Sequence, residues 1–251
     1  MAETTSDQAT KRAGFSGRRV IIALAIYFLV GLGVGWFWRA GLVSRDAVHN
    51  YMEWYQGNFQ DVEPRNFWLG VPVWKSPLDL WIYEEILYRT KPDVLIEAGT
   101  YKGGSALYFA SIFQLMGNGR VITIDIRAYP GRPQNRRITY LIGSSTSNSV
   151  VEQVKNLIHP GERVMVVLDS DHHKAHVLKE LRFYSPLVSV GCYLVVEDTS
   201  FREFPPPGQN YPNPADAVDE FLKSHHEFTP DRSCERFGVT MFPGGCLQRI
   251  H

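Results

Sequence analysis

The sequence has no excess charge of either sign and little cysteine. Its 26 Lys and Arg balance its 26 Asp and Glu, which argues against a surface built to bind nucleic acid, so we expect no such partner. The three cysteines, Cys192, Cys234 and Cys246, form no CxxC pair and no even-numbered set. This excludes the usual zinc and disulfide scaffolds. We expect buried free thiols, with a Cys234–Cys246 bridge as the alternative in an oxidising compartment.

Two sequence motifs are also missing. No GxGxxG follows an apolar run, which argues against a dinucleotide-binding site. No HExxH is present either, although His172 and His176 have the four-residue spacing of a helical zinc pair. Without that motif or a supporting cysteine, we interpret His172 as a general base, a role suited to an imidazole that titrates near neutral pH.

Long apolar runs are absent except at the amino terminus. Val20 to Trp38 contains 19 residues without a charge, about 28 Å as a helix, which is enough to cross the hydrocarbon of a bilayer. Four basic residues precede this run, and Trp36, Phe37 and Trp38 stand where an interfacial aromatic belt would lie. A cleavable signal peptide would have a shorter apolar region and a small-x-small site after it. We therefore predict a retained single-pass membrane anchor.

The rest of the chain alternates apolar runs with amphipathic segments. This alternation predicts a doubly wound, mostly parallel α/β sheet. We expect an antiparallel edge hairpin formed by residues 239–242 and 246–250. The predicted organisation is a disordered basic tail (1–19), the anchor (20–38), a connector with an aromatic loop (39–75) and the α/β domain (76–251). The predicted strands are 94–97, 121–125, 138–142, 164–168 and 193–196.

A glycine-rich turn follows the first of these strands, from Glu97 to Ser105. Its glycines allow a close approach of the backbone to a ligand, and the helix that follows offers free N–H groups. Asp125 ends the next strand, where a carboxylate can accept both hydroxyls of a ribose. The alternatives are a turn that uses glycine only for steric reasons and an aspartate that only caps its strand.

Three carboxylates, those of Asp169, Glu197 and Asp198, end two further strands. Because the carboxyl ends of parallel strands meet at one edge of a sheet, we expect these acids to lie together. Unpaired, they would repel one another, and Mg²⁺ with its preference for oxygen ligands would relieve that repulsion. The alternative is that water solvates each acid separately.

Three segments together carry a family resemblance: 97–105 (EAGTYKGGS), 167–172 (VLDSDH) and 193–198 (YLVVED). They resemble the cephalosporin hydroxylase and rhamnosyl O-methyltransferase family, which has the Rossmann-like class I fold that binds S-adenosylmethionine. The resemblance implies that the turn holds the methionine part of the cofactor, Asp125 its ribose and the next strand end its adenine, and that the acids bind Mg²⁺. The residues implied for the cofactor are Glu97, Gly99, Gly103, Ser105, Asp125, Ser144 and Ser145, and those for the metal are Asp169, Glu197 and Asp198.

The stretch from Asp169 to His172 also resembles the Asp-Ala-Asp-Lys of cation-dependent caffeoyl-CoA-type O-methyltransferases. In those enzymes the first aspartate binds metal, the second contacts the cofactor, and the lysine is the presumed base. The resemblance therefore implies a cofactor contact for Asp171. His172 stands where those enzymes have the lysine, which leaves the identity of the base open.

We therefore predict a membrane-anchored, Mg²⁺-dependent O-methyltransferase that acts on a hydroxyl of a small molecule or sugar. A hydroxylase of the same family and a non-catalytic module that binds S-adenosylmethionine are the alternatives. The basic residues before the anchor favour a domain outside the cytoplasm. A cofactor made in the cytosol favours the opposite, so the orientation stays open. The sequence is compatible with a homo-oligomer, and it does not identify the acceptor.

Overall fold

The computed structural model describes residues 45–58 and 66–251. The predicted tail and membrane anchor lie outside these described residues. Within the two described ranges, no helix is both long enough and apolar enough to span a bilayer. Residues Val48–His251 form one compact unit.

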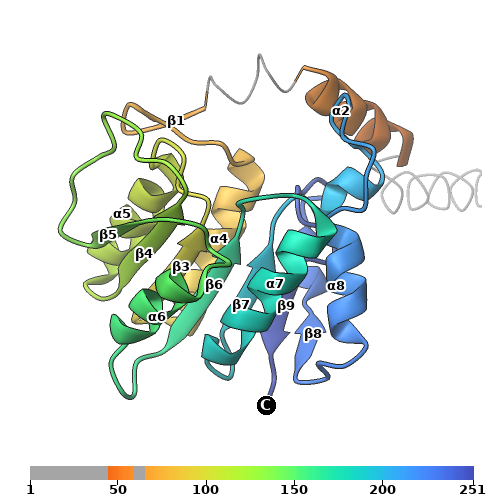
Figure 1. The fold of residues 1–251 in the computed structure, drawn as a ribbon. Coiled ribbons are helices and arrows are strands. Elements are labelled where there is room, and N and C mark those ends of the chain that lie inside the picture. Colours follow the sequence, from red (N-terminus) through yellow and green to blue (C-terminus); the bar gives the residue numbers. More distant parts are fainter. Residues whose placement is uncertain (1–44, 59–65) are drawn as a thin grey trace, which may run out of the picture. The chain divides into compact units, whose positions relative to one another are not determined.

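The centre of this unit is a seven-stranded sheet in the order β5-β4-β3-β6-β7-β9-β8 (Figure 1). β5, β4, β3, β6 and β7 are parallel, while β9 pairs antiparallel with both β7 and β8. After β3 the chain adds β4 and β5 on one side of it, and then β6 and β7 on the other side, so the strand order switches between β3 and β6. Such a switch point leaves a crevice at the carboxyl ends of the strands. The strands are β3 (Val94–Ala98), β4 (Arg120–Asp125), β5 (Ile138–Ile142), β6 (Val164–Leu168), β7 (Tyr193–Val196), β8 (Phe228–Pro230) and β9 (Cys246–Arg249).

Helices cover both faces of the sheet, and this explains why the central strands are apolar without alternation. Leu95 and Val167 pack with α4 and α5 on one face, whereas Ile96 and Val166 pack with α6, α7 and α8 on the other (Figure 1). The α-helices are α2 (Arg45–Gly57), α4 (Pro77–Thr90), α5 (Gly104–Met116), α6 (Asn148–Asn156), α7 (Lys174–Tyr184) and α8 (Pro214–Leu222). The short 3₁₀ helices are η2 (Ser185–Leu187), η3 (Thr199–Arg202) and η4 (Arg232–Glu235).

Helix boundaries follow local signals in the sequence. Ser147 caps α6 because its side chain accepts a hydrogen bond from the backbone N–H of Val150. Asn213 and Asp216 form a reciprocal capping box at the start of α8, with Pro214 at the first helical position. These signals set the first residues of both helices.

The predicted edge hairpin is wrong in one of its strands. β9 is present, but it pairs with β8, in the register Phe228↔Arg249, and residues 239–242 form no strand. The backbone of Met241 bonds elsewhere: its N–H donates to the buried Asp79 carboxylate at 2.8 Å, and its carbonyl accepts from Ser200. With these groups engaged, the segment cannot join a β ladder.

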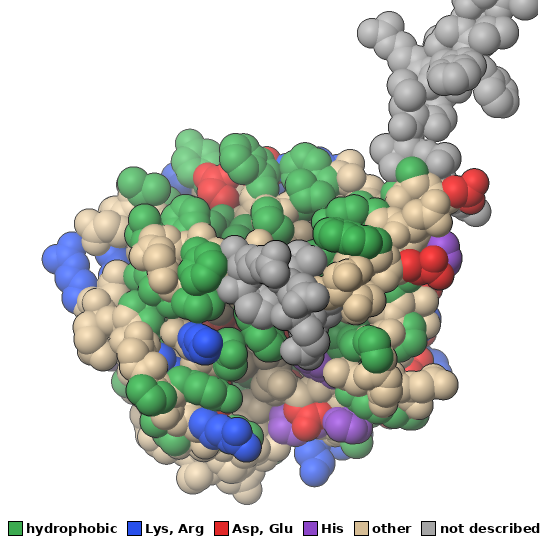
Figure 2. Space-filling view, turned by 90° about the horizontal axis from the view of Figure 1, so that it is seen from above, with side chains coloured by type: hydrophobic (Ala, Val, Ile, Leu, Met, Phe, Trp, Pro, Cys, Tyr) green, Lys and Arg blue, Asp and Glu red, His purple; other side chains and the backbone are tan. Residues whose placement is uncertain are grey.

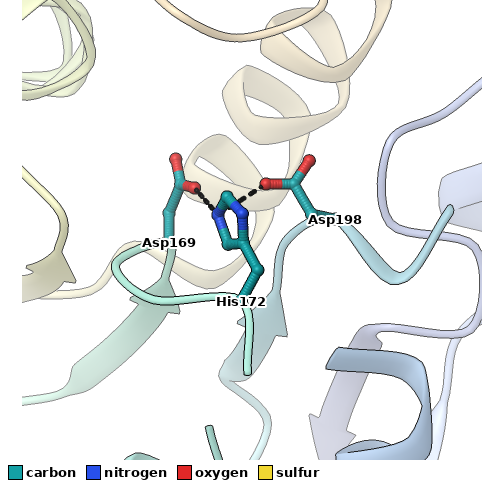
Figure 3. Close-up of side chains that lie close together, drawn as sticks. All are labelled: Asp169, His172 and Asp198. Carbon is teal, nitrogen blue, oxygen red and sulfur yellow. Dashed lines mark ion pairs between the residues drawn. The ribbon is translucent and has the colours of Figure 1, made fainter. Parts of the chain in front are cut away.

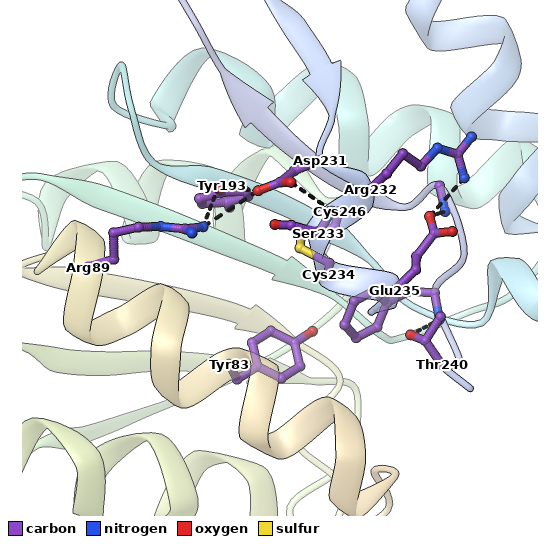
Figure 4. The surroundings of a disulfide bond; sticks show 12 residues. Tyr83, Arg89, Tyr193, Asp231, Arg232, Ser233, Cys234, Glu235, Thr240 and Cys246 are labelled. Atoms are coloured by element: carbon purple, nitrogen blue, oxygen red, sulfur yellow. Dashed lines mark hydrogen bonds and ion pairs between the residues drawn. A yellow bond between two sulfur atoms is a disulfide. The ribbon is translucent and has the colours of Figure 1, made fainter. Parts of the chain in front are cut away.

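The expectation of free thiols is wrong for two of the three cysteines. Cys234 on η4 and Cys246 on β9 form a disulfide (Figure 4), while Cys192 is free and buried. The bridge lies between the end of the sheet and α4, close to a network in which Arg89 and Tyr193 both bond Asp231. Sequence spacing alone could not show that the chain folds η4 back onto β9.

A small hairpin precedes α4. β1 (Phe67–Trp68) pairs antiparallel with β2 (Val71–Pro72) through a turn in which Leu69 and Gly70 both have positive φ. The next residues, Trp74 and Lys75, lead directly into the start of α4. This path carries the aromatic loop to the carboxyl edge of the sheet.

Candidate active site

A cavity of about 520 Å³ opens at the carboxyl ends of the parallel strands. Figure 2 looks down on this edge, where hydrophobic side chains cover much of the surface. Most of the residues predicted for the site line the cavity: Gly99, Ser105, Asp125, Ser145, Asp169, Asp171, His172, Glu197 and Asp198. Glu97, Gly103 and Ser144 do not line it. The fold therefore gathers at one place residues that lie up to a hundred positions apart in the sequence.

The glycines of the turn are required by neighbouring backbone. Gly99 has a φ of +103°, and a Cβ there would collide with the carbonyl of Asp169. A Cβ on Gly104 would collide with the carbonyl of Pro72. Gly103 has a φ of +83° and is the N-cap of α5. The steric alternative for this turn is therefore correct at Gly99 and Gly104, and it brings β3, β6 and β2 close together around the cavity.

Asp125 lies at the end of β4 with its carboxylate held by three donors. Its Oδ2 accepts from the backbone N–H of Tyr101 at 2.7 Å and from Arg132 at 3.1 Å, and its Oδ1 accepts from the backbone N–H of Arg127 at 2.9 Å. Because each carboxylate oxygen can accept more than one hydrogen bond, Asp125 keeps acceptor capacity toward the cavity.

Glu97 lies on β3 and is fully buried. Its Oε2 accepts from the hydroxyl of Thr123 at 2.6 Å, whereas Oε1 has no hydrogen-bond partner among the described residues. Burial raises the pKa of Glu97, although Lys75 opposes the shift. A buried carboxylate oxygen without a donor is suited to an amino group of a bound ligand.

The adenine side of the predicted site is organised by a carboxylate that the sequence did not single out. Ser145 and Ser170 both donate to Oε1 of Glu180, at 2.5 and 2.6 Å, and His176 Nε2 lies 3.2 Å from each hydroxyl. Glu180 is fully buried in α7. Ser144 instead lies beside Thr146, at 3.0 Å, in the turn before α6.

Asp171 lies at the rim of the cavity, at the start of α7. Its Oδ1 accepts from the backbone N–H of His173 at 2.8 Å, and the His173 ring lies 2.7 Å away. These bonds outweigh the effect of burial and lower the pKa of Asp171. The side chain is thus an anion close to the cofactor region that the resemblance predicts.

Asp169, His172 and Asp198 form a compact cluster on the wall of the cavity (Figure 3). Nε2 of His172 lies 2.9 Å from Oδ2 of Asp198 and 3.7 Å from Oδ1 of Asp169. Burial opposes the charged imidazole, but the two carboxylates raise the pKa of His172 well above its ordinary value. The two neighbouring carboxylates thus favour the protonated imidazole.

Glu197 points to a different partner, Lys75. Nζ of Lys75 lies 2.7 Å from Oε1 of Glu197 and 2.8 Å from Oδ2 of Asp169, and the lysine side chain is only 2% exposed. The hydroxyl of Tyr83 donates to the same Glu197 oxygen at 2.6 Å. Burial raises the pKa of Glu197 to about 8, against the effect of Lys75. Burial also opposes ionisation of Asp169, but Lys75 and His172 lower its pKa.

The cluster of Asp169, His172 and Asp198 offers the kind of donor atoms that bind a divalent cation. One oxygen each from Asp169 and Asp198, with His172 Nε2, lie within 4.8 Å of one another, and carboxylate oxygens are the ligands that Mg²⁺ prefers. Glu197 is brought to the same cavity, but its Oε1 is engaged by Lys75 and Tyr83. The expectation that water solvates the acids separately is wrong, because each acid contacts another charged side chain.

Lys75, Tyr83 and Glu180 are site residues that the sequence reasoning missed. Lys75 stands alone in an apolar, aromatic stretch, and a lone charge in such a stretch was the one available signal. Tyr83 and Glu180 follow ordinary helical spacing and carry no signal of their own.

The comparison with known proteins agrees with this geometry. A family model described as "Rhamnosyl O-methyltransferase/CmcI" matches residues 60–250. The chain is 37% identical over 213 residues to a "Rhamnosyl O-methyltransferase" of Mycobacterium tuberculosis (strain ATCC 25618 / H37Rv), covering 81% of this chain and 86% of that protein. It is 34% identical over 220 residues to the protein of the same name from Mycobacterium leprae (strain TN), covering 84% and 95%.

Solved structures share the fold. One described as "cmcI-D160 Mg-SAM" superposes with a TM-score of 0.59 at 22% identity, covering 76% of this chain and 78% of that one. The corresponding "CmcI-N160 apo-structure" also has a TM-score of 0.59, at 20% identity, covering 75% and 77%. The fold predicted from the sequence, a Rossmann-like α/β domain with a mostly parallel sheet, is confirmed. The chain therefore belongs to the rhamnosyl O-methyltransferase/CmcI family, as its motifs predicted, and its enzyme class is that of the S-adenosylmethionine-dependent O-methyltransferases.

Proposed function

We propose that the protein transfers a methyl group from S-adenosylmethionine to a hydroxyl group of a sugar or a similar small molecule, with Mg²⁺ in the site. The observation that carries this proposal is the cluster of Asp169, His172 and Asp198 on the wall of a cavity that also exposes Asp125. A sugar acceptor is supported by the name of the relatives at 37% identity.

Each end of the cofactor has a suitable partner in the chain. The unpaired Oε1 of Glu97 would accept from the amino group of the methionine part, and Asp125 would accept from the ribose hydroxyls. Ser145 and His176, joined by Glu180, would border the adenine. Gly99 and Gly104 of the turn line the same cavity, between these partners.

The proton of the acceptor hydroxyl would be taken by His172. Bound Mg²⁺, held by Asp169 and Asp198, would supply Lewis-acid polarisation of the acceptor oxygen. Once their charges are neutralised, the two aspartates no longer favour the imidazolium, and Nε2 of His172 can accept a proton. The chain's own contribution is to hold base and acceptor in line with the methyl donor.

Aromatic rings also line the cavity. Trp74 and Tyr101 lie 4.6 Å apart between ring centroids, and Tyr101 and Tyr129 lie 5.0 Å apart. Their faces give a wall against which the apolar face of a sugar ring could pack. Through Trp74, the aromatic loop would form part of the acceptor pocket.

The activity is tested with radiolabelled S-adenosylmethionine and a panel of rhamnosides, other sugars, phenols and lipid-linked acceptors, with and without EDTA. We expect transfer to a sugar hydroxyl that EDTA abolishes and added Mg²⁺ restores. Asp169→Ala should reduce the rate at least about 100-fold, whereas Glu152→Gln, at an exposed position on α6, should not change it. Activity that survives chelation, or undiminished transfer by Asp169→Ala, would remove the metal from the mechanism.

We also propose that residues 20–38 anchor the enzyme in a membrane as a single-pass helix. The support is the length and apolarity of that run and the basic residues before it. Fractionation of cells expressing the full chain should place it with the membranes, and a chain beginning at Arg45 should not sediment with them. Protease protection in sealed vesicles then decides which side the catalytic domain occupies.

A further inference from the structure

Glu180 is a fully buried carboxylate whose partners all line the cavity. Its Oε1 accepts from the hydroxyls of Ser145 and Ser170, at 2.5 and 2.6 Å, and lies 3.5 Å from Nε2 of His176. Its Oε2 is buried and has no hydrogen-bond partner among the described residues. Glu180 itself, in α7, does not line the cavity. It therefore acts on the cavity only through these three neighbours.

The carboxylate sets the direction in which the two hydroxyl protons point. A serine hydroxyl has one proton to donate and two lone pairs that can accept. An ionised carboxylate only accepts, and a hydrogen bond to it is stronger than one between neutral groups. The protons of Ser145 and Ser170 are therefore directed at Oε1 of Glu180. Toward a ligand in the cavity, both hydroxyls then offer lone pairs and no proton.

His176 reinforces this direction. Its Nε2 lies 3.2 Å from each serine hydroxyl. The hydrogen bond with Glu180 raises the pKa of His176, although burial opposes the shift. A proton on Nε2 is thus favoured, and the imidazole donates toward the oxygens around it rather than accepting the serine protons.

The position of Ser145 is also fixed from α7. Tyr184, one turn after Glu180 on this helix, is fully buried and donates its hydroxyl to the backbone carbonyl of Ser145 at 2.8 Å. The side chain of Ser145 is held by Glu180 and its backbone by Tyr184. Its hydroxyl oxygen is therefore a hydrogen-bond acceptor that is already in place before a ligand binds.

We propose that Glu180 makes this end of the cavity selective for adenine over hypoxanthine, by holding the oxygens of Ser145 and Ser170 as acceptors. Glu180 is thus a positioning residue, which acts through the two serines without touching the ligand. The inference rests on the proposed function, in which the adenine of S-adenosylmethionine lies beside Ser145.

The chemical basis is the group that each purine carries next to these oxygens. Adenine has an exocyclic amino group, which donates, and hypoxanthine has a carbonyl oxygen in its place, which accepts. The amino group matches two acceptors. The carbonyl would face lone pairs with no proton between them, and a site built for one hydrogen-bonding pattern rejects an analogue that leaves its polar groups unpaired.

The test compares two probes by isothermal titration calorimetry on the full-length protein in detergent. They are S-adenosylhomocysteine and S-inosylhomocysteine, which carries hypoxanthine in place of adenine. The native protein should bind the adenine compound at least about tenfold more tightly. In Glu180→Gln, an amide that turns its NH₂ toward the serines donates to their oxygens and frees their protons for the ligand. The preference should then fall below about threefold.

Tyr184→Phe is the matched control. It removes the hydroxyl that holds the backbone of Ser145 but leaves both serines bonded to Glu180. It should weaken the binding of both probes alike and keep their ratio within about twofold of the native value. A merely structural role for Glu180 would give the same result in Glu180→Gln, so the ratio separates the two roles.

Three outcomes are decisive. An unchanged ratio in Glu180→Gln would overturn the inference, and so would equal binding of the two probes by the native protein. If Glu180→Gln does not fold, as judged by circular dichroism, Ser145→Ala takes its place. That variant leaves Glu180 bonded to Ser170 and should lower the preference at least about twofold, so an unchanged ratio overturns the inference. Absence of any binding of S-adenosylhomocysteine by the native protein would overturn the proposed function as well, whereas binding without a preference overturns only this inference.

Discussion

Arg132 donates from Nη2 to Oδ2 of Asp125 at 3.1 Å, and both side chains are largely buried. The same guanidinium donates to the backbone carbonyls of Tyr101 and Arg127, each at 2.8 Å. One side chain therefore connects the glycine turn, the end of β4 and the loop that follows it. The orientation of the Asp125 carboxylate depends on this connection.

We predict that Arg132→Met weakens binding of S-adenosylhomocysteine about three- to tenfold, as expected for lost hydrogen bonds that position Asp125. Asp125→Ala, which removes the carboxylate itself, should weaken binding more. Isothermal titration calorimetry measures both constants. Arg136→Met is the control, because this arginine donates to the side chain of Gln114 and makes no hydrogen bond to Asp125 in the described part of the chain. Unchanged affinity in both Arg132→Met and Asp125→Ala would contradict the ribose assignment.

Gly99→Ala should destabilise the protein by more than about 3 kcal/mol. The added Cβ would collide with the backbone carbonyl of Asp169 at a φ of +103° that side chains rarely adopt, and neither strand end can move without loosening the sheet. Urea unfolding followed by circular dichroism measures the change. Gly131→Ala, where φ is +77° and no atom lies within 4 Å, should cost about 1–2 kcal/mol. Equal losses in the free energy of unfolding at Gly99 and Gly131 would show that the contact between Gly99 and the carbonyl of Asp169 is unimportant.

Acid should weaken the pair formed by Arg120 and Glu162. Two hydrogen bonds from Arg120, with that from the backbone of His159, lower the pKa of Glu162 to about 2. A lowered carboxyl pKa contributes stability at pH values above the unfolded value of 4.5, and the contribution is lost as the pH falls toward 2.

Glu162→Gln should therefore cost about 1–2 kcal/mol at pH 7, a value that allows for the partial exposure of the pair. The difference between this variant and the native protein should shrink steadily between pH 4.5 and pH 2. Unfolding in urea at several pH values measures it. Glu152→Gln, in an exposed pair with Lys155, should change stability by less than about 0.5 kcal/mol at any pH.

The Cys234–Cys246 disulfide determines how many thiols can react with a thiol reagent. Denatured but unreduced protein should show one reactive thiol, that of Cys192, and reduction should expose three. Because the bridge closes a short loop with a separation of 12 residues, replacing both cysteines by alanine should cost about 3 kcal/mol. Three reactive thiols before reduction would show that the bridge does not form in the protein as isolated.

Much of the fold could be predicted from local sequence. The runs from Val94, Val164 and Tyr193 are short and apolar, so each specifies a buried parallel strand without reference to distant residues. The candidate acids followed from the same reasoning, because a residue that ends a parallel strand must lie at the carboxyl edge. The prediction of a strand at 239–242 was wrong because the backbone N–H of Met241 donates to Asp79, a residue far away in the chain.

What the sequence by itself determined is which residues end the strands, and therefore which side chains meet at one edge: Asp125, Asp169, Glu197 and Asp198. What only the tertiary structure decided is how those side chains are shared. Lys75 lies 94 positions from Asp169 and 122 from Glu197, so no local pattern relates it to either acid. The folded chain places Lys75 between Glu197 and Asp169, and it places His172 beside both aspartates. That arrangement depends on distances between atoms, which exist only once the chain has folded.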